Sequence, residues 1–302
     1  MNDFPEKSGE DAGSGGAACC LTVAGSDSGG NAGVQADLRA FHAYGLHGCT
    51  AFAALTAQNP FGVYAVHEVP PDFIAAQLDA VLGVYSIKSM KTGMLASAAA
   101  IEAVADRIAA HGEIMKVVDP VMVATSGARL IENDAVEALK TKLFPLATAI
   151  TPNLPEAEVL AGRPITCRAD VREAAKELHG RFGCAVLVKG GHATGDLAPA
   201  EDTLYDGKDF HAYVLPQIAN PVSTHGTGCS LAAALAAELA LGRSLPEAVV
   251  GAKRYVHDAI ASSYLVGRGC GVLGWGADSV RGGSCLLQVP PGTTRRQGRD
   301  LP

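Results

Sequence analysis

The chain has 302 residues, a length that one α/β domain can hold, and 48% of them are hydrophobic, which is enough for a large core. Aromatic residues make up only 5%, which favours helices packed closely on a sheet over an aromatic-rich β-sandwich. The formal net charge of -7 argues against a nucleic acid as the main partner, although a local pocket can still bind a small anion.

The two ends of the chain are polar and rich in Gly, Ser or Pro, so we predict disordered tails at 1–17 and 286–302 around a single domain at 18–285. The N-terminus lacks the apolar core of a secretory signal, and no apolar run is long enough for a membrane span. The eight cysteines include no Cys-x-x-Cys pair, so we expect no zinc site and a reducing, cytoplasmic location.

Short apolar runs alternate with amphipathic segments along the predicted domain. The runs predict strands at 18–24, 49–55, 87–91, 115–119, 147–151 and 185–189. The segments between and after them predict helices at 34–44, 71–82, 98–110, 134–143, 155–161, 170–182, 230–241 and 246–264. A late antiparallel pair is expected at 203–205 and 210–215, around the turn at Asp206-Gly207. This order predicts a three-layer α-β-α fold with a mainly parallel central sheet.

In such folds ligands bind at the carboxyl ends of the strands, and the residues that follow the predicted strands are rich in Gly, Asp, Asn and Lys. They are Gly25-Ser26-Asp27, Gln58-Asn59, Thr92-Gly93-Met94, Asp119-Pro120, Thr151-Pro152-Asn153 and Lys189-Gly190-Gly191-His192. Turn chemistry alone also enriches Gly and Asn at such positions, so the concentration is a first indication of function and no more.

The segment from Thr224 to Ser230, THGTGCS, comes directly before an Ala/Leu-rich helix. Its glycines allow the backbone to approach a ligand, and the helix start offers free N–H groups and a partial positive charge for a phosphate. A thiol at this place, Cys229, should have a lowered pKa and could take a proton from a hydroxyl group. The alternative is a turn in which Cys229 and Ser230 only cap the helix.

Two further segments are ambiguous by themselves. The glycine-rich stretch 25–33 matches neither the dinucleotide fingerprint nor the P-loop, so a flexible turn is the default and Asp37 beyond it can be purely structural. In the segment TPNLPE, Asn153 and Glu156 offer oxygen ligands that suit Mg²⁺, but they can equally be a helix cap. Asp119 and Lys189, which follow other strands, carry the same ambiguity.

Taken together and in order, these segments resemble the hydroxymethylpyrimidine/phosphomethylpyrimidine kinases of thiamine biosynthesis, in the ribokinase-like superfamily. The resemblance covers residues 20–265 and is carried by LTVAGSDSGGNAGVQADLRAF, ALTAQN, KTGMLAS, VVDPVMVATSG, TPNLPEAEVLAG, VLVKGGH and STHGTGCSLAAALAA. It implies a homodimer that uses ATP and Mg²⁺ to phosphorylate 4-amino-5-hydroxymethyl-2-methylpyrimidine and then its monophosphate.

The resemblance also implies roles for individual residues. The proposed general base is Cys229, beside an anion hole made by the backbone N–H groups of Gly226, Thr227, Gly228 and Cys229. The pyrimidine pocket is implied at Asp37, Thr56, Gln58 and Met94. The nucleotide and metal neighbourhood is implied at Lys189, Asn153, Thr224, Asp119 and Glu156, with the two carboxylates near Mg²⁺.

The sequence departs from this pattern at Thr125, where relatives often carry Lys, and at Asn31, where Gly is usual. The C-terminal segment GRGCGVLGWGADSV also lacks the His-rich ending of relatives. A pyridoxal kinase is the nearest alternative, although the subgroup that shares the GTGC loop carries a lid cysteine that the stretch 121–129 lacks. A non-catalytic protein that keeps the fold and binds a pyrimidine is the other alternative.

Overall fold

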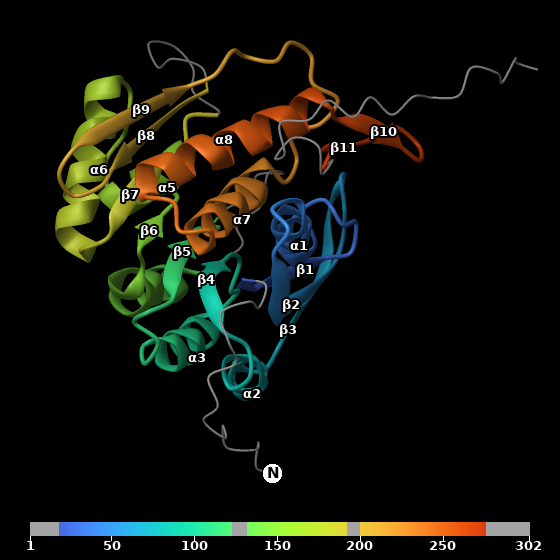
Figure 1. Ribbon diagram of the computed structural model, residues 1–302, viewed down its shortest axis with the longest axis vertical. Coiled ribbons are helices and arrows are strands. Elements are labelled where there is room, and N and C mark those ends of the chain that lie inside the picture. Colours follow the sequence, from blue (N-terminus) through green and yellow to red (C-terminus); the bar gives the residue numbers. More distant parts are fainter. Residues whose placement is uncertain (1–17, 123–131, 192–199, 276–302) are drawn as a thin grey trace, which may run out of the picture.

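The computed structural model describes residues 18–122, 132–191 and 200–275 (Figure 1). The predicted tails at 1–17 and 286–302 and the departure at Thr125 lie outside the described residues. Within the described ranges the chain forms a central sheet between two layers of helices, as the alternation of strands and helices predicts.

The central sheet has nine strands in the order β3-β2-β1-β4-β5-β6-β7-β8-β9. Their bounds are β1 (Cys19–Asp27), β2 (His47–Asn59), β3 (Gly62–Glu68), β4 (Ile87–Thr92), β5 (Met115–Val118), β6 (Ala149–Ile150), β7 (Ala185–Val188), β8 (Glu201–Tyr205) and β9 (Phe210–Val214). Neighbours from β2 through β7 pair in parallel, whereas β3, β8 and β9 are added antiparallel. The chain runs from β1 outward to β2 and β3 and returns to β4 on the other side of β1, which makes a switch point where ligands bind in open α/β sheets.

The helices form the two outer layers. One layer contains α2 (Pro71–Leu82), α3 (Ala98–Ile108), α4 (Asn133–Ala138), α5 (Leu154–Ala161) and α6 (Arg168–Phe182). The other contains α1 (Gly33–Ala43), α7 (Thr227–Ala240) and α8 (Leu245–Ala261). A π-helical turn (Leu139–Leu143) and a 3₁₀ turn (Phe144–Leu146) extend α4, and a small hairpin of β10 (Tyr264–Val266) and β11 (Cys270–Val272) follows α8.

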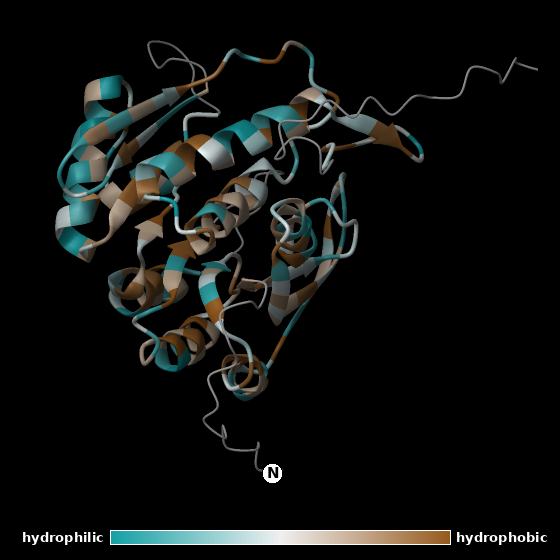
Figure 2. Ribbon diagram, viewed as in Figure 1, coloured by the Kyte–Doolittle hydropathy of each residue, from teal (hydrophilic) through white to brown (hydrophobic). Residues whose placement is uncertain are grey.

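Each face of the sheet has its own hydrophobic core, because successive residues of a strand point to opposite faces. In β7, Val186 and Val188 pack in one core while Leu187 packs in the other. Helix α7 is apolar on nearly all sides and lies against both the sheet and α8, which explains its long run of buried alanines and leucines (Figure 2). This burial fixes the start of α7 against the sheet.

Three differences from the sequence-based elements bear on the site. Strand β2 continues to Asn59 in a hairpin with β3, so Gln58 and Asn59 belong to a strand and do not follow one. The prediction of a helix from 230 was three residues short, because α7 begins at Thr227 and places Cys229 in its first turn. Strand β3 and the β10–β11 hairpin were not predicted at all, since most of their side chains are exposed and carry no buried alternation.

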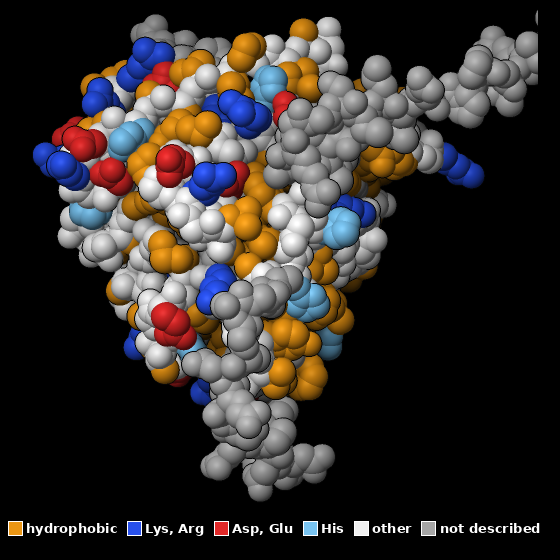
Figure 3. All heavy atoms as spheres, in the orientation of Figure 1, with side chains coloured by type: hydrophobic (Ala, Val, Ile, Leu, Met, Phe, Trp, Pro, Cys, Tyr) orange, Lys and Arg blue, Asp and Glu red, His pale blue; other side chains and the backbone are white. Residues whose placement is uncertain are grey.

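The edge formed by β2 and β3 exposes several large apolar side chains. Leu55, Phe61, Tyr64 and Val66 are each at least 45% exposed, and hydrophobic side chains gather over this region in the space-filling view (Figure 3). Among the helices in the described part of the chain, none has the length and apolar character that crossing a membrane requires.

Candidate active site

One cavity of about 640 Å³ lies at the carboxyl ends of the parallel strands. Every residue that the sequence suggested for the site lines it except Asp37, so segments from six parts of the chain converge here. These residues are Thr56, Gln58, Met94, Asp119, Asn153, Glu156, Lys189, Thr224, Gly226, Thr227, Gly228 and Cys229. The volume is in the range of sites for small molecules and cofactors.

The start of α7 forms one wall of the cavity, and Gly226 precedes its first residue. Gly226 has a φ of 88°, and a Cβ added there would lie 1.9 Å from the carbonyl oxygen of Asn31, so only glycine fits. The N–H of Thr227 donates to the carbonyl of Thr224 at 3.4 Å, and that of Ser230 to the carbonyl of Gly226 at 2.9 Å. Among the described residues this leaves the N–H groups of Gly226, Gly228 and Cys229 without a partner outside the helix, three of the four donors expected from the sequence.

The prediction that the pKa of Cys229 is lowered is wrong. Burial raises the pKa of this thiol above its ordinary value, although the nearby Lys91 and a hydrogen bond from the backbone N–H of Gly33 oppose the rise. The sequence shows that the residue starts a helix, which favours a thiolate, but not that helix α1 and the sheet enclose it. In the protein without ligands, Cys229 therefore holds its proton more tightly than a free thiol.

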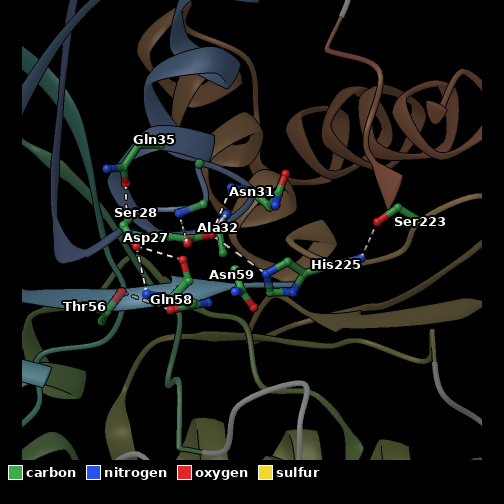
Figure 4. A network of polar contacts seen from close by, with 12 residues as sticks. Asp27, Ser28, Asn31, Ala32, Gln35, Thr56, Gln58, Asn59, Ser223 and His225 are labelled. Carbon is green, nitrogen blue, oxygen red and sulfur yellow. Dashed lines mark hydrogen bonds and ion pairs between the residues drawn. The ribbon is translucent and has the colours of Figure 1, made fainter. Parts of the chain in front are cut away.

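The glycine-rich stretch after β1 is an ordered loop and not the flexible turn that we took as the default. The Asp27 carboxylate accepts hydrogen bonds from the N–H groups of Gly29, Asn31 and Ala32 at 2.8 to 2.9 Å, as Figure 4 shows. His225, from the loop before α7, places its Nε2 3.8 Å from the same carboxylate. Burial acts to raise the pKa of Asp27, but the contact with His225 and the three N–H groups outweighs it, so the pKa is lowered and the charged form holds the loop.

Asn31, where relatives usually carry Gly, fits this loop without strain. Its side chain is 3% exposed, and positive φ angles occur at Gly30 and Gly33 but not at Asn31 itself. The substitution therefore does not require a different backbone shape at this position.

The residues suggested for the pyrimidine pocket come from β2 and the end of β4. The Thr56 hydroxyl donates to the Ser26 carbonyl at 2.7 Å and lies 3.2 Å from Oε1 of Gln58. The backbone N–H of Gln58 is held in turn by the Ser28 hydroxyl at 2.8 Å (Figure 4). Met94 packs close to Gly25, where an added Cβ would lie 2.6 Å from its terminal methyl. Among the described residues Nε2 of Gln58 donates no hydrogen bond, so it can meet a polar substituent of a ligand, and Met94 adds an apolar side chain to the same cavity.

A cluster of charged side chains also lines the cavity. Nζ of Lys189 donates to Oδ1 of Asp119 at 2.7 Å, and the Thr151 hydroxyl donates to the same oxygen at 2.9 Å. Glu156 forms a capping box with Asn153 at the start of α5, and its other oxygen lies 3.4 Å from the N–H of Met122. Burial raises the pKa of Glu156 to about 7, with Asp119 adding to the rise and Lys189 opposing it.

Asp37 is not part of the cavity wall, contrary to the place suggested for it. Its side chain is 0% exposed on α1, where both carboxylate oxygens accept hydrogen bonds from Nζ of Lys91 at 2.9 to 3.0 Å. The Thr22 hydroxyl donates to it at 2.6 Å. Lys91, on β4, stands between Asp37 and the cavity and reaches its wall.

The match to known families identifies the chain. The model of the phosphomethylpyrimidine kinase family matches residues 27–274. The chain belongs to this family. The hydroxymethylpyrimidine/phosphomethylpyrimidine kinase of Synechococcus elongatus is 47% identical over 84% of this chain and 95% of that protein. The thiamine biosynthesis bifunctional protein ThiED of Geobacter sulfurreducens is 50% identical over 83% of this chain, but the chain spans only 51% of its length.

Solved structures agree with this family assignment and with the predicted fold. An ADP complex of Bacillus subtilis pyridoxal kinase superposes with a TM-score of 0.79 at 36% identity, covering 88% of this chain and 99% of that one. The prediction of a ribokinase-like α/β fold is confirmed.

In this phosphomethylpyrimidine kinase family member, several residues that line the cavity were not predicted from the sequence. Lys253 on α8 donates to the carboxylate of Asp202 on β8 at 2.7 Å, and that carboxylate also holds the N–H of Gly190 at 2.9 Å. This pair fixes the loop after Lys189, although its members lie far apart in the sequence. The same end of the cavity has apolar walls at Leu215, Ile218, Val256 and Ile260. Neither the Lys253–Asp202 pair nor these apolar residues follow a predicted parallel strand. A search limited to the carboxyl ends of strands therefore does not find them.

Proposed function

We propose that the protein transfers the γ-phosphoryl group of ATP to the hydroxymethyl group of 4-amino-5-hydroxymethyl-2-methylpyrimidine, and a second phosphoryl group to the resulting monophosphate, in thiamine biosynthesis. The observation that carries the proposal is the convergence of three kinds of groups on one cavity. A thiol at a helix start, the Asp119–Lys189–Glu156 cluster and the polar edge of β2 all line it. The names of the relatives supply the substrate class.

In the first transfer, the substrate hydroxyl oxygen forms a bond to the γ-phosphorus while the bond to the β,γ-bridging oxygen breaks and ADP leaves. The ionised form of Cys229 takes the hydroxyl proton on Sγ and becomes a neutral thiol. The N–H groups of Gly228 and Cys229 stabilise negative charge on the transferred group, and Lys189 lies beside them, with Nζ 3.5 Å from the position of a Cβ on Gly228. Phosphoryl transfer depends mainly on such positioning and charge stabilisation.

The second transfer differs in one respect. Its acceptor is a phosphate oxygen that is already ionised near neutral pH, because the second pKa of a phosphate monoester is about 6. No proton has to be removed, so the proposed base has no task in this step, whereas the N–H groups and Lys189 are needed in both.

The charged cluster fits a Mg²⁺ ion that arrives with the nucleotide. Asp119, Glu156 and Asn153 offer oxygen donors, and the described residues include no group of three or more His, Cys, Asp or Glu that could hold a metal by themselves. Mg²⁺ in kinases is bound by one or two carboxylates together with phosphates and waters, which matches this sparse donor set. When bound, the ion would neutralise charge on the β- and γ-phosphates. Without the ion, the Lys189 ammonium pairs with Asp119 at 2.7 Å.

Pyridoxal kinase activity is the second candidate, because the likeness to the Bacillus subtilis pyridoxal kinase is close in fold. The deciding assay measures ADP formation with the pyrimidine alcohol, its monophosphate and pyridoxal, each with ATP and Mg²⁺. We expect kcat/KM to be highest for the pyrimidine alcohol and the monophosphate to be turned over as well. Faster turnover of pyridoxal would reverse the choice, and binding without ADP formation would favour a non-catalytic protein.

We also infer a homodimer in the cytoplasm. The exposed apolar side chains on the β2–β3 edge support a protein interface, since apolar patches of this kind usually mark one. Light scattering on the Phe61→Lys and Tyr64→Lys double variant, compared with the unaltered protein, tests it. We expect the mass to fall by half, and an unchanged mass would place the interface elsewhere or leave the chain monomeric.

A further inference from the structure

The Lys91–Asp37 ion pair lies beneath the catalytic wall of the cavity and is fully buried. Both side chains are 0% exposed, and the pair closes with two contacts of 2.9 and 3.0 Å. The Thr22 hydroxyl adds a third contact to Asp37 at 2.6 Å. Burial pushes the pKa of Asp37 upward, but the short contacts to an ammonium lead us to assign the pair as ionised.

A buried ion pair usually contributes little to the net stability of a fold. Removing two charges from water costs several kcal/mol per ion, and replacing such a pair by apolar side chains of similar size is often neutral or stabilising. The position of the pair therefore suggests a role in the chemistry of the neighbouring cavity.

The Lys91 ammonium and the Cys229 thiol come from two elements that pack on each other. Both residues reach the cavity wall, and helix α7, which carries Cys229, packs on β4, which carries Lys91. The ammonium lies under the backbone just after β4, since a Cβ on Gly93 would be 2.7 Å from Nζ. Helix α1, which carries Asp37, also packs against α7. The pair thus places one positive and one negative charge near the thiol, and Lys91 influences its pKa more than Asp37 does.

We propose that Lys91, held by Asp37 that Thr22 in turn orients, is a positioning residue that stabilises the Cys229 thiolate before this thiolate takes the substrate proton. The inference rests on the proposed role of Cys229 as the base. The ammonium stabilises the negative sulfur that must be present before proton abstraction, and Asp37 holds the ammonium in place. Four charged groups face the thiol: Lys91 from β4, Asp37 from α1, Asp119 from the end of β5 and Lys189 from the end of β7.

The directions of the pKa values agree with this arrangement. Burial acts to lower the pKa of Lys91, but Asp37, Cys229 and Asp119 together raise it, so the ammonium persists. Burial raises the pKa of Cys229, and Lys91 is the strongest influence against that rise, whereas Asp37 and Asp119 add to it. Removing Asp37 and removing the whole pair should therefore shift the thiol in opposite directions, which a merely structural pair would not do.

The test measures the rate at which Cys229 is alkylated by iodoacetamide as a function of pH, by mass spectrometry of the peptide that contains it. Nucleotide and Mg²⁺ are left out, so that only the charges of the protein act. We expect Asp37→Asn, which is nearly isosteric, to speed alkylation at pH 7, because it removes a negative charge near the thiol while Cys229 and Asp119 still favour the charged form of Lys91. We expect the Lys91→Met and Asp37→Asn double variant to slow it on the order of tenfold, because an opposite charge nearby shifts a pKa by about 1 or more.

Lys116→Met is the matched control, since Lys116 is also buried, at 4% exposure, but donates to the carbonyls of His111 and Ile114 at the other end of the sheet. It should leave the profile of Cys229 unchanged. An unchanged or slower rate in Asp37→Asn overturns the proposal even if the double variant does not fold. The alkylation readout is independent of kinase activity, so full turnover in a Cys229→Ala protein would refute the base without affecting this measurement.

Discussion

Replacing Glu156 by glutamine should make the protein more stable at alkaline pH while it loses Mg²⁺-dependent activity. Glu156 is 3% exposed, and its pKa is raised from an ordinary 4.5 to about 7 because burial disfavours the charged form. A shift of this size corresponds to about 3 kcal/mol between the two protonation states. Glutamine has the same shape and keeps an oxygen that can accept the N–H of Asn153, now bound at 2.8 Å.

The sign follows from proton binding. Between pH 4.5 and about 7 the folded protein keeps a proton on Glu156 that the unfolded chain releases, so the unaltered protein loses stability as the pH rises through this window. The variant has no such loss. We therefore expect Glu156→Gln to match the unaltered protein at pH 5 and to exceed it by up to about 3 kcal/mol at pH 8.

Urea unfolding at the two pH values, followed by circular dichroism and extrapolated to water, measures both differences. Glu102→Gln, an exposed glutamate on α3, is the control and should change little at either pH. If Glu156→Gln is destabilised at pH 8, or stabilised equally at both values, then Glu156 does not carry a desolvated charge and the reasoning is refuted.

Two further substitutions test the walls of the cavity. Gly226→Ala should lose stability and most activity, because its φ of 88° costs about 1–2 kcal/mol for any other residue and the new Cβ meets the Asn31 carbonyl. Gly242→Ala is the control, because Gly242 has a similar φ of 81° but no atom within 4 Å of an added Cβ. In thermal unfolding it should lose only the stability that the backbone conformation costs. Equal losses of stability in the two variants would show that the Asn31 carbonyl does not restrict position 226. Gln58→Ala should raise KM for the pyrimidine about 5- to 30-fold, the effect of one lost hydrogen bond, with KM for ATP unchanged in steady-state kinetics; an equal rise in both would separate Gln58 from the pyrimidine.

The sequence was most informative where one local pattern decides the outcome. Strand–helix alternation predicts the layers and the parallel strands, and turn residues after β5, β6 and β7 mark the edge where Asp119, Asn153 and Lys189 meet. The capping box of Asn153 and Glu156 is visible in TPNLPE as well, and the structure shows that this cap and the cavity wall are the same residues. The two interpretations that the sequence left open are thus compatible.

The sequence was least informative where burial and long-range pairing decide. The environment of Cys229 depends on how α1 and the sheet enclose the start of α7, and this reverses the direction of its pKa. Asp37 lies one helical turn beyond the glycine loop, but Lys91, 54 positions later, takes its place at the wall. Strand β3 forms an exposed edge, where no buried periodicity marks a strand.

The most direct test of the account compares both phosphoryl transfers in a Cys229→Ala protein, with the buried Cys184→Ala as control. Alanine keeps the backbone N–H and removes only the proton acceptor. We predict that kcat for the pyrimidine alcohol falls by at least about 100-fold, as for loss of a general base, while kcat for the monophosphate changes little. Equal loss in the two reactions, or none in either, would contradict a thiolate that acts on the hydroxyl proton.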